Sequence, residues 1–146
     1  MARNPASVLF CCTNNALRSP MAEALAKFLF GRTLYVDSVG LRAREVDPFA
    51  VAVMDEIGID IAGHRAKTFD HLDDTSFDLI VSLTPEAQHR AVELTRSMAT
   101  EVEFWNTFDP SLVEGNREAC LDAYRAVRDQ LLERLKRRFE QPGAPP

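Results

Sequence analysis

The stretch VLFCCTNNALRSPMAE, residues 8–23, decides the fold that this sequence predicts. An apolar run over Ser7–Cys11 indicates a buried strand, and it stops at a polar loop. Ser19-Pro20 then opens a segment with apolar residues at helical spacing. Serine is a favourable helix cap and proline suits the first helical position, so we expect the helix to begin there. Strand, loop and helix in this order are typical of an α/β fold with a parallel sheet.

The rest of the chain continues this alternation. Further strands are predicted over Thr33–Asp37, Phe77–Leu83 and Glu101–Trp105, and further helices from Pro48 to Gly58, from Pro85 onward and from Asn116 to Phe139. The predicted fold is an α/β three-layer sandwich, with a four-stranded parallel sheet and helices on both faces. We expect a single domain over residues 1–141 and a disordered tail over residues 142–146.

Length and charge limit the class of protein. The chain has 146 residues, with 17 Lys and Arg against 22 Asp and Glu, and a formal net charge of −5. This length suits one domain with a real core. No apolar run approaches the ~18–20 residues of a membrane span, and the N-terminus lacks a signal-peptide pattern. We expect a cytoplasmic protein, and the net acidity argues against nucleic acid or a membrane as its partner. The oligomeric state is left open.

The number and spacing of the cysteines also favour a cytoplasmic protein. There are three, an odd number, and Cys11 and Cys12 are adjacent, so a disulfide framework is not expected and a reducing compartment is the natural setting. By strand alternation Cys11 faces away from Cys12 and into the core. Cys120 lies on the predicted last helix, where packing is the simplest role. The cysteines and histidines show no metal-ligand spacing, so we expect neither a metal nor a cofactor.

The loop of residues 12–18 carries the chemistry. In a parallel α/β sheet, ligands bind beyond the carboxyl ends of the strands. A loop that enters a helix there points its N–H groups at one spot, which favours a tetrahedral oxyanion and stabilises a thiolate at its base. The guanidinium of Arg18 is able to bind two oxygens of the same anion. The loop therefore predicts attack by Cys12 on phosphorus, and the plain alternative for Cys12 is a buried small hydrophobe.

A second candidate is Asp109-Pro110, after the predicted fourth strand. A carboxylic acid at this edge of the sheet is able to protonate a leaving group and later to activate water. The alternative is an ordinary turn or helix cap. Asp47-Pro48 is read as such a cap in this same chain.

Residues 8–23, Asp37–Gly40, Gly58–Lys67 and Phe108–Pro110 together resemble the low-molecular-weight protein tyrosine phosphatase family, whose superfamily includes the thioredoxin-coupled arsenate reductases. The resemblance covers about residues 7–140. It implies that Cys12 is the nucleophile, Arg18 the clamp on the transition state and Asp109 the general acid. The phosphoryl oxygens would be held by the backbone amides of Thr13, Asn14, Asn15, Ala16, Leu17 and Arg18.

The resemblance also implies a supporting network. Asn15 would adopt a left-handed conformation, which asparagine tolerates better than most residues. Ser19, Ser38 and His64 would hold it there, with His64 as a support rather than an acid or a base. The Ser19 hydroxyl would also assist Cys12 as the leaving group of the second step.

Three positions depart from the family pattern. Asn14 stands where glycine is usual. Leu17 stands where many members carry a second cysteine, so Cys12 has no partner within the loop for a protective disulfide. Ser111-Leu112 replaces the aromatic residues that wall the cleft of eukaryotic-type members.

The predicted function is a cysteine-dependent phosphatase that hydrolyses phosphomonoesters, protein phosphotyrosine above all, through a phosphocysteine. The expected partner is a phosphorylated protein or a small aryl phosphate. One alternative is arsenate reduction with an external thiol, because residues 82–90 contain no cysteine for an internal relay. The other is a non-catalytic oxyanion-binding module.

Overall fold

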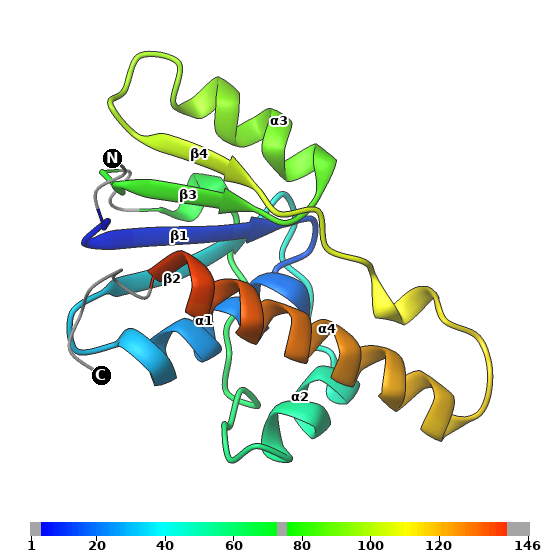
Figure 1. Ribbon diagram of the computed structural model, residues 1–146. Coiled ribbons are helices and arrows are strands. Elements are labelled where there is room, and N and C mark those ends of the chain that lie inside the picture. Colours follow the sequence, from blue (N-terminus) through cyan, green and yellow to red (C-terminus); the bar gives the residue numbers. More distant parts are fainter. Residues whose placement is uncertain (1–3, 73–75, 140–146) are drawn as a thin grey trace.

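The strands form one sheet in which β1 is an inner strand. The computed structural model describes residues 4–72 and 76–139, and its strands are β1 (Ser7–Cys12), β2 (Tyr35–Gly40), β3 (Leu79–Ser82) and β4 (Glu101–Phe104). They pair in parallel in the order β2-β1-β3-β4 (Figure 1). This confirms the predicted four-stranded parallel sheet. The predicted tail over residues 142–146 lies outside the described residues.

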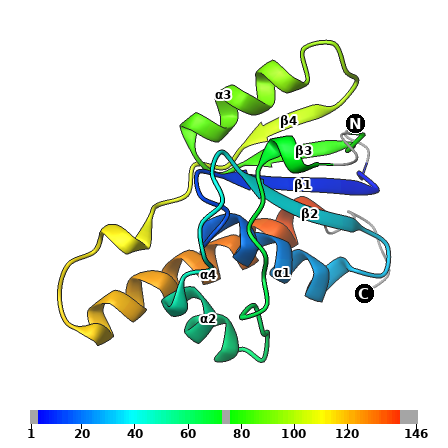
Figure 2. The same ribbon diagram turned by 180° about the vertical axis from the view of Figure 1, so that it is seen from behind.

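Helices cover both faces of this sheet. They are α1 (Arg18–Phe30), α2 (Pro48–Asp55), α3 (Pro85–Leu94) and α4 (Arg117–Phe139), with short 3₁₀ turns η1 (Phe69–His71) and η2 (Pro110–Leu112). The helices α1, α2 and α4 lie together on one side and α3 lies on the other, in both the front and the back view (Figures 1 and 2). The predicted α/β layering is therefore confirmed.

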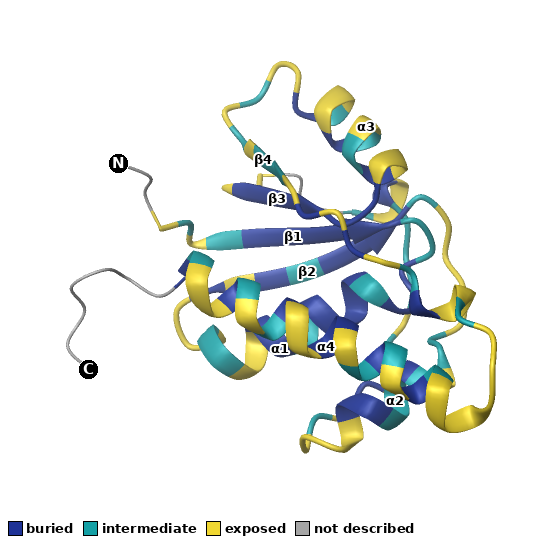
Figure 3. Cartoon of the chain, turned by 45° about the vertical axis from the view of Figure 1, so that its right-hand side comes forward, coloured by how far each residue is buried: buried dark blue, intermediate teal, exposed yellow. Residues whose placement is uncertain are grey.

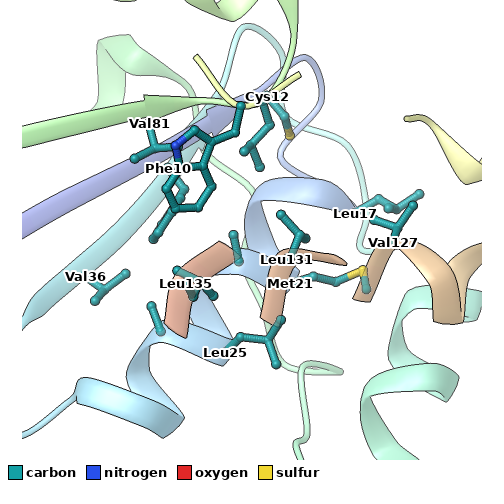
Figure 4. Close-up of a cluster of buried hydrophobic side chains, with 14 of the residues drawn as sticks. Phe10, Cys12, Leu17, Met21, Leu25, Val36, Val81, Val127, Leu131 and Leu135 are labelled. Carbon is teal, nitrogen blue, oxygen red and sulfur yellow. The ribbon is translucent and has the colours of Figure 1, made fainter. Parts of the chain in front are cut away.

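Strand alternation divides the core into two clusters. Val8, Phe10 and Cys12 of β1 point to the side of α1 and α4, where Figure 4 shows Met21, Leu25, Leu131 and Leu135 gathered. Leu9 and Cys11 point to the other side, where Ala87 and Ala91 of α3 meet them. In Figure 3, β1 is buried along most of its length and exposed residues line the outer sides of the helices. Burial of both faces explains the continuous apolar run in β1.

Several predicted boundaries are wrong, and two of them lie next to the loop of residues 12–18. The second strand begins at Tyr35 and continues to Gly40, because its partner β1 supplies a register from Ser7↔Tyr35 to Cys12↔Gly40. The first helix begins at Arg18, with Leu17 at the cap position and no side-chain cap. The Ser19 hydroxyl contacts Asn15 Nδ2 and Cys12 Sγ instead.

Two further dipeptides, Asp47-Pro48 and Thr84-Pro85, begin helices as predicted, with Asp47 and Thr84 as the N-caps. Asp47 accepts hydrogen bonds from the amides of Phe49 and Ala50 at 2.8 and 3.4 Å, and Thr84 accepts one from Ala87 at 3.2 Å. The second helix ends earlier than expected, at Asp55, and Gly58 turns the chain with φ of +80°. Among the described residues, no helix combines the length and the apolar character that crossing a bilayer requires.

Candidate active site

Residues from three separate segments line one small cavity at the carboxyl end of β1. Its volume is about 80 Å³, and its wall consists of Cys12, Asn14, Ala16, Leu17, Arg18, Asp47, Asp109 and Ser111. A water molecule takes about 30 Å³ of the liquid, so this space has room only for a very small ligand or group. The three predicted catalytic residues Cys12, Arg18 and Asp109 therefore meet in one place.

The loop of residues 13–17, next to this cavity, differs in how it uses its backbone carbonyl and N–H groups. Its carbonyl oxygens are used on the other side, since Arg42, Arg44 and Asp47 donate their backbone N–H to the carbonyls of Thr13, Asn14 and Ala16 at 2.8–3.1 Å. The N–H groups of residues 13–17 donate to no other group among the described residues. These donors lie at the positive end of α1, and we call the loop that carries them the cradle.

Gly40 allows the loop to approach the end of β2. A Cβ atom at this position would lie 2.6 Å from the Asn15 nitrogen and 2.6 Å from the Arg42 carbonyl oxygen. Both are backbone atoms that cannot turn aside. Gly40 is therefore a requirement of the loop, although the sequence analysis assigned it no role.

Asn15 ties the loop of residues 13–17 to three other parts of the chain through its side chain. It is fully buried and has φ of +50°, the left-handed conformation that the family resemblance implies. Its Nδ2 donates to the hydroxyls of Ser19 at 2.8 Å and Ser38 at 3.0 Å. Its Oδ1 accepts from the backbone N–H of Lys67 at 3.0 Å and from His64 Nε2 at 3.1 Å. These four contacts hold a conformation that the backbone alone disfavours.

The hydrogen bonds of this network can be followed outward from the side-chain amide of Asn15. Because Asn15 Nδ2 has only hydrogens to offer, Ser19 and Ser38 both accept from it. Ser38 then donates its own proton to Glu23 Oε1. The Ser19 hydroxyl lies 2.9 Å from Cys12 Sγ, where either atom can be the donor, and it also donates to the carbonyl oxygen of Val39 at 3.4 Å. The network therefore holds the Ser19 hydroxyl within hydrogen-bond distance of the sulfur.

His64 supports the same asparagine from the outside. Its Nε2 faces both the carbonyl oxygen and Oδ1 of Asn15 at 3.1 Å, so Nε2 carries the hydrogen. Burial lowers the pKa of His64 below its ordinary value, which keeps the ring neutral. The ring does not line the cavity. It supports the loop and is not placed to exchange a proton there.

Arg18 lies between the cradle and Asp109. Its side chain is 14% exposed, its Nη1 donates to the carbonyl oxygen of Thr107 at 3.0 Å, and its Nη2 is 3.8 Å from Asp109 Oδ2. The carbonyl of Thr107 fixes the guanidinium, since the Thr107 N–H donates at 3.0 Å to the carbonyl oxygen of Leu83, the residue that follows β3. The remaining N–H groups stay available for anionic oxygens.

Asp109 reaches the cavity from the segment after β4. Its backbone is extended, with φ of −89° and ψ of 102°, as expected before a proline. The other carboxyl oxygen, Oδ1, accepts from the backbone N–H and the hydroxyl of Ser111 at 3.0 and 2.6 Å. One oxygen is therefore engaged by the chain and the other faces Arg18.

Asp47 brings a second carboxylate to the cavity wall, which the sequence analysis treated as a helix cap only. Its Oδ1 caps α2, and its Oδ2 accepts from the hydroxyl of Tyr124 on α4 at 2.7 Å. Burial and this bond to Asp47 raise the pKa of Tyr124, so the phenol stays protonated. Both oxygens of Asp47 are therefore committed to the scaffold.

The two other cysteines are outside the cavity. Cys11 is fully buried on the opposite face of the sheet, as predicted, and burial raises its pKa to about 12. Cys120 on α4 donates to the carbonyl oxygen of Val113 at 3.5 Å. Among the described residues, no group of three or more His, Cys, Asp or Glu side chains is placed to hold a metal ion.

Comparison with known proteins agrees with this geometry. A model of the family "Low molecular weight phosphotyrosine protein phosphatase" matches residues 7–141. The chain belongs to this family. The matched residues include all the strands and helices given above, the cradle and the segment that carries Asp109. Proteins similar to this chain are named phosphatases or arsenate reductases.

Individual family members of both kinds are similar to the chain. An arsenate reductase of Halalkalibacterium halodurans is 37% identical over 133 residues, which cover 91% of this chain and 94% of the relative. A glutaredoxin arsenate reductase of Synechocystis sp. is 34% identical over 131 residues, covering 88% and 92%. The solved structure of a low-molecular-weight protein tyrosine phosphatase from T. tengcongensis has a TM-score of 0.73 at 27% identity and covers 89% of this chain and 95% of its own.

Proposed function

We propose that this chain hydrolyses phosphomonoesters through a covalent phosphocysteine on Cys12. The observation that carries the proposal is that Cys12, Arg18 and Asp109 line a single small cavity. The three residues offer a nucleophile, a clamp for the equatorial oxygens and an acid. A module that only bound oxyanions would have no use for the acid.

In the first step, the Cys12 thiolate attacks phosphorus in line with the ester oxygen. The S–P bond forms as the P–O bond of the ester breaks. Asp109 gives its proton to the departing oxygen, so an alcohol or phenol leaves and Asp109 becomes a carboxylate. Arg18 and the amides of the cradle stabilise the charge on the equatorial oxygens, an effect worth about 10²–10³-fold for a single donor.

In the second step, a water molecule attacks the phosphocysteine. Asp109 takes a proton from the water, the new P–O bond forms and the S–P bond breaks. The sulfur leaves as a thiolate, which the Ser19 hydroxyl stabilises from 2.9 Å. Inorganic phosphate departs and both catalytic groups return to their starting states.

For the substrate we propose an aryl phosphate, with protein phosphotyrosine as the physiological class. Phe108 and Leu112, on either side of Asp109 in the chain, are 55% and 70% exposed. They offer apolar surface near the acid, where an aromatic leaving group would depart. The partner would then be a phosphorylated protein.

Arsenate reduction is a second candidate, and the names of the relatives favour it over the phosphatase. In that reaction Cys12 displaces a protonated oxygen of arsenate as water. An external thiol then attacks the Cys12 sulfur, and the electron pair of the S–As bond reduces arsenic to arsenite. A second thiol reduces the mixed disulfide. Because Cys11 and Cys120 do not line the cavity, both thiols must come from outside, and one relative is named a glutaredoxin enzyme.

Two parallel assays on the full chain separate these functions. One follows p-nitrophenyl phosphate hydrolysis, and the other follows NADPH consumption with arsenate, glutathione, glutaredoxin and glutathione reductase. We expect hydrolysis that falls by at least about 10⁴-fold in Cys12→Ser, as for removal of other catalytic nucleophiles. Cys120→Ser is the matched control and keeps its activity. NADPH consumption without ester hydrolysis would establish the reductase instead, and phosphate binding with neither activity would establish a binding module.

A further inference from the structure

We propose that Ser111 is a positioning residue that selects which oxygen of Asp109 carries the transferred proton. The inference rests on the phosphatase function proposed above and adds a residue to it. Ser111 occupies a position where the sequence departs from the aromatic residues of eukaryotic-type family members. Its hydroxyl lies 2.6 Å from Asp109 Oδ1, and both residues line the cavity of Cys12.

Both contacts from Ser111 are made to the same oxygen. Oδ1 accepts from the backbone N–H at 3.0 Å as well as from the hydroxyl. An oxygen that already accepts two hydrogen bonds is a poor place for a proton, because the proton would face two donors. The proton of the acid form is therefore directed to Oδ2, the oxygen on the side of Arg18. This is where the leaving-group oxygen of a bound phosphoester would lie.

The hydroxyl contributes more than the turn around Asp109 requires. Asp109 caps η2 by accepting from the Ser111 N–H, and that bond persists whatever side chain residue 111 carries. The hydroxyl bond is additional, and it stabilises the carboxylate over the acid. Loss of the hydroxyl should therefore change the protonation of Asp109 while leaving the turn in place.

The other ionisable groups around Asp109 stay constant in this comparison. Arg18 approaches it from α1, Cys12 from β1 and Asp47 from the start of α2, and Tyr124 of α4 interacts with it electrostatically. Among the described residues, the Ser111 hydroxyl forms a hydrogen bond to Asp109 and to none of these four. A change seen on removing the hydroxyl is therefore assigned to the Ser111–Asp109 bond.

The test compares Ser111→Ala with Ser111→Thr, which keeps a hydroxyl, and with Ser97→Ala, a matched change at an exposed serine outside the cavity. Asp109→Asn first identifies the part of the pH–rate profile that belongs to Asp109. In Ser111→Ala we expect this part to move to higher pH and kcat to fall about three- to tenfold, the usual net effect of one hydrogen bond. KM should stay unchanged. Ser111→Thr and Ser97→Ala should follow the wild type.

A double variant and a direct titration complete the test. In the Asp109→Asn background, Ser111→Ala should have no further effect on kcat. The hydrogen bond from the Ser111 hydroxyl to the Asp109 carboxylate is already altered in that background. Carbon NMR of the labelled Asp109 carboxyl should show the same move to higher pH in the resting protein, which requires no turnover. Equal titrations in wild type and Ser111→Ala would overturn the inference even if the phosphatase is active. Absence of hydrolysis in the wild type with shifted NMR titration would instead refute the proposed function alone.

Discussion

Cys11 and Cys12 are adjacent in the chain, yet they belong to opposite sides of the sheet. Cys11 is fully buried in the cluster under α3, with its Sγ 3.4 Å from Ser82 Oγ, and burial raises its pKa to about 12. Cys12 lines the cavity at the start of α1 with its Sγ 2.9 Å from Ser19 Oγ. The same side chain is thus a core residue on one face and a candidate nucleophile on the other. What differs is the set of donors around the sulfur, since the cradle lies on one side only.

The largest expected effect concerns the reactivity of the two thiols. Iodoacetate should alkylate Cys12 and abolish activity, while Cys11 stays unmodified, because a thiol with a pKa of about 12 is protonated at neutral pH. We expect the rates to differ by at least about 100-fold. Peptide mass spectrometry identifies the modified residue, and phosphate should protect Cys12 by filling the cradle.

The partly exposed Cys120 is the control for this experiment. Its alkylation should neither affect activity nor respond to phosphate, because it lies outside the cavity. Faster modification of Cys11 than of Cys12, or inactivation that tracks Cys120, would remove the distinction between the two faces.

A substitution at Gly40 should disturb the Cys12 side alone. In Gly40→Ala the new Cβ meets the Asn15 nitrogen and the Arg42 oxygen at 2.6 Å, so the loop or β2 must shift. We expect a loss of about 1–3 kcal/mol in the free energy of unfolding, the usual cost of overpacking. Urea denaturation measures this loss, and isothermal titration with phosphate should show weaker binding.

Gly63→Ala is the matched control, since a Cβ there has no atom within 4 Å. Its stability should stay within about 0.5 kcal/mol of the wild type. Equal effects of the two substitutions would show that the close approach of Gly40 to the loop is unimportant.

The smallest effect is a pH dependence carried by His64. Burial lowers its pKa in the folded protein, so the unfolded chain binds a proton first as the pH falls. Stability is therefore full above the unfolded value of about 6.5 and declines as the pH drops from there toward the lower folded value. Urea denaturation at a series of pH values measures this slope.

His64→Gln should flatten the slope, and His89→Gln should not, because the side chain of His89 is 81% exposed on α3. A slope that persists unchanged in His64→Gln would contradict the assignment. The effect reaches Cys12 only through Asn15, which is why we expect it to be small.

The two Asp-Pro dipeptides show that a local sequence pattern does not predict the distant partners of a residue. Local chemistry predicted a cap at Asp47-Pro48 and left Asp109-Pro110 open between an acid and a cap. The structure makes both of them caps and places both at the wall of the same cavity. Only their partners separate them, since Tyr124 engages Asp47 and Arg18 faces Asp109. Those partners lie 77 and 91 positions away in the chain.

The start of α1 illustrates the same limit. Ser19-Pro20 has the composition of a helix start, and the helix does begin nearby. The Ser19 side chain, however, accepts from Asn15 and reaches Cys12 instead of capping the helix. A local rule cannot anticipate this, because Asn15 is held in place by Lys67 and His64 from a distant segment.

The sequence by itself determined the layered α/β architecture, the opposite orientation of the two adjacent cysteines and the position of the cradle between β1 and α1. These follow from periodicity and local backbone chemistry, which act over a few residues. The tertiary structure alone decided which residues complete the site: Gly40 behind the loop, Glu23 at the end of the hydroxyl network, Thr107 on Arg18 and Ser111 on Asp109. Each depends on the meeting of segments that the parallel sheet brings together at one edge, and no local pattern encodes that meeting.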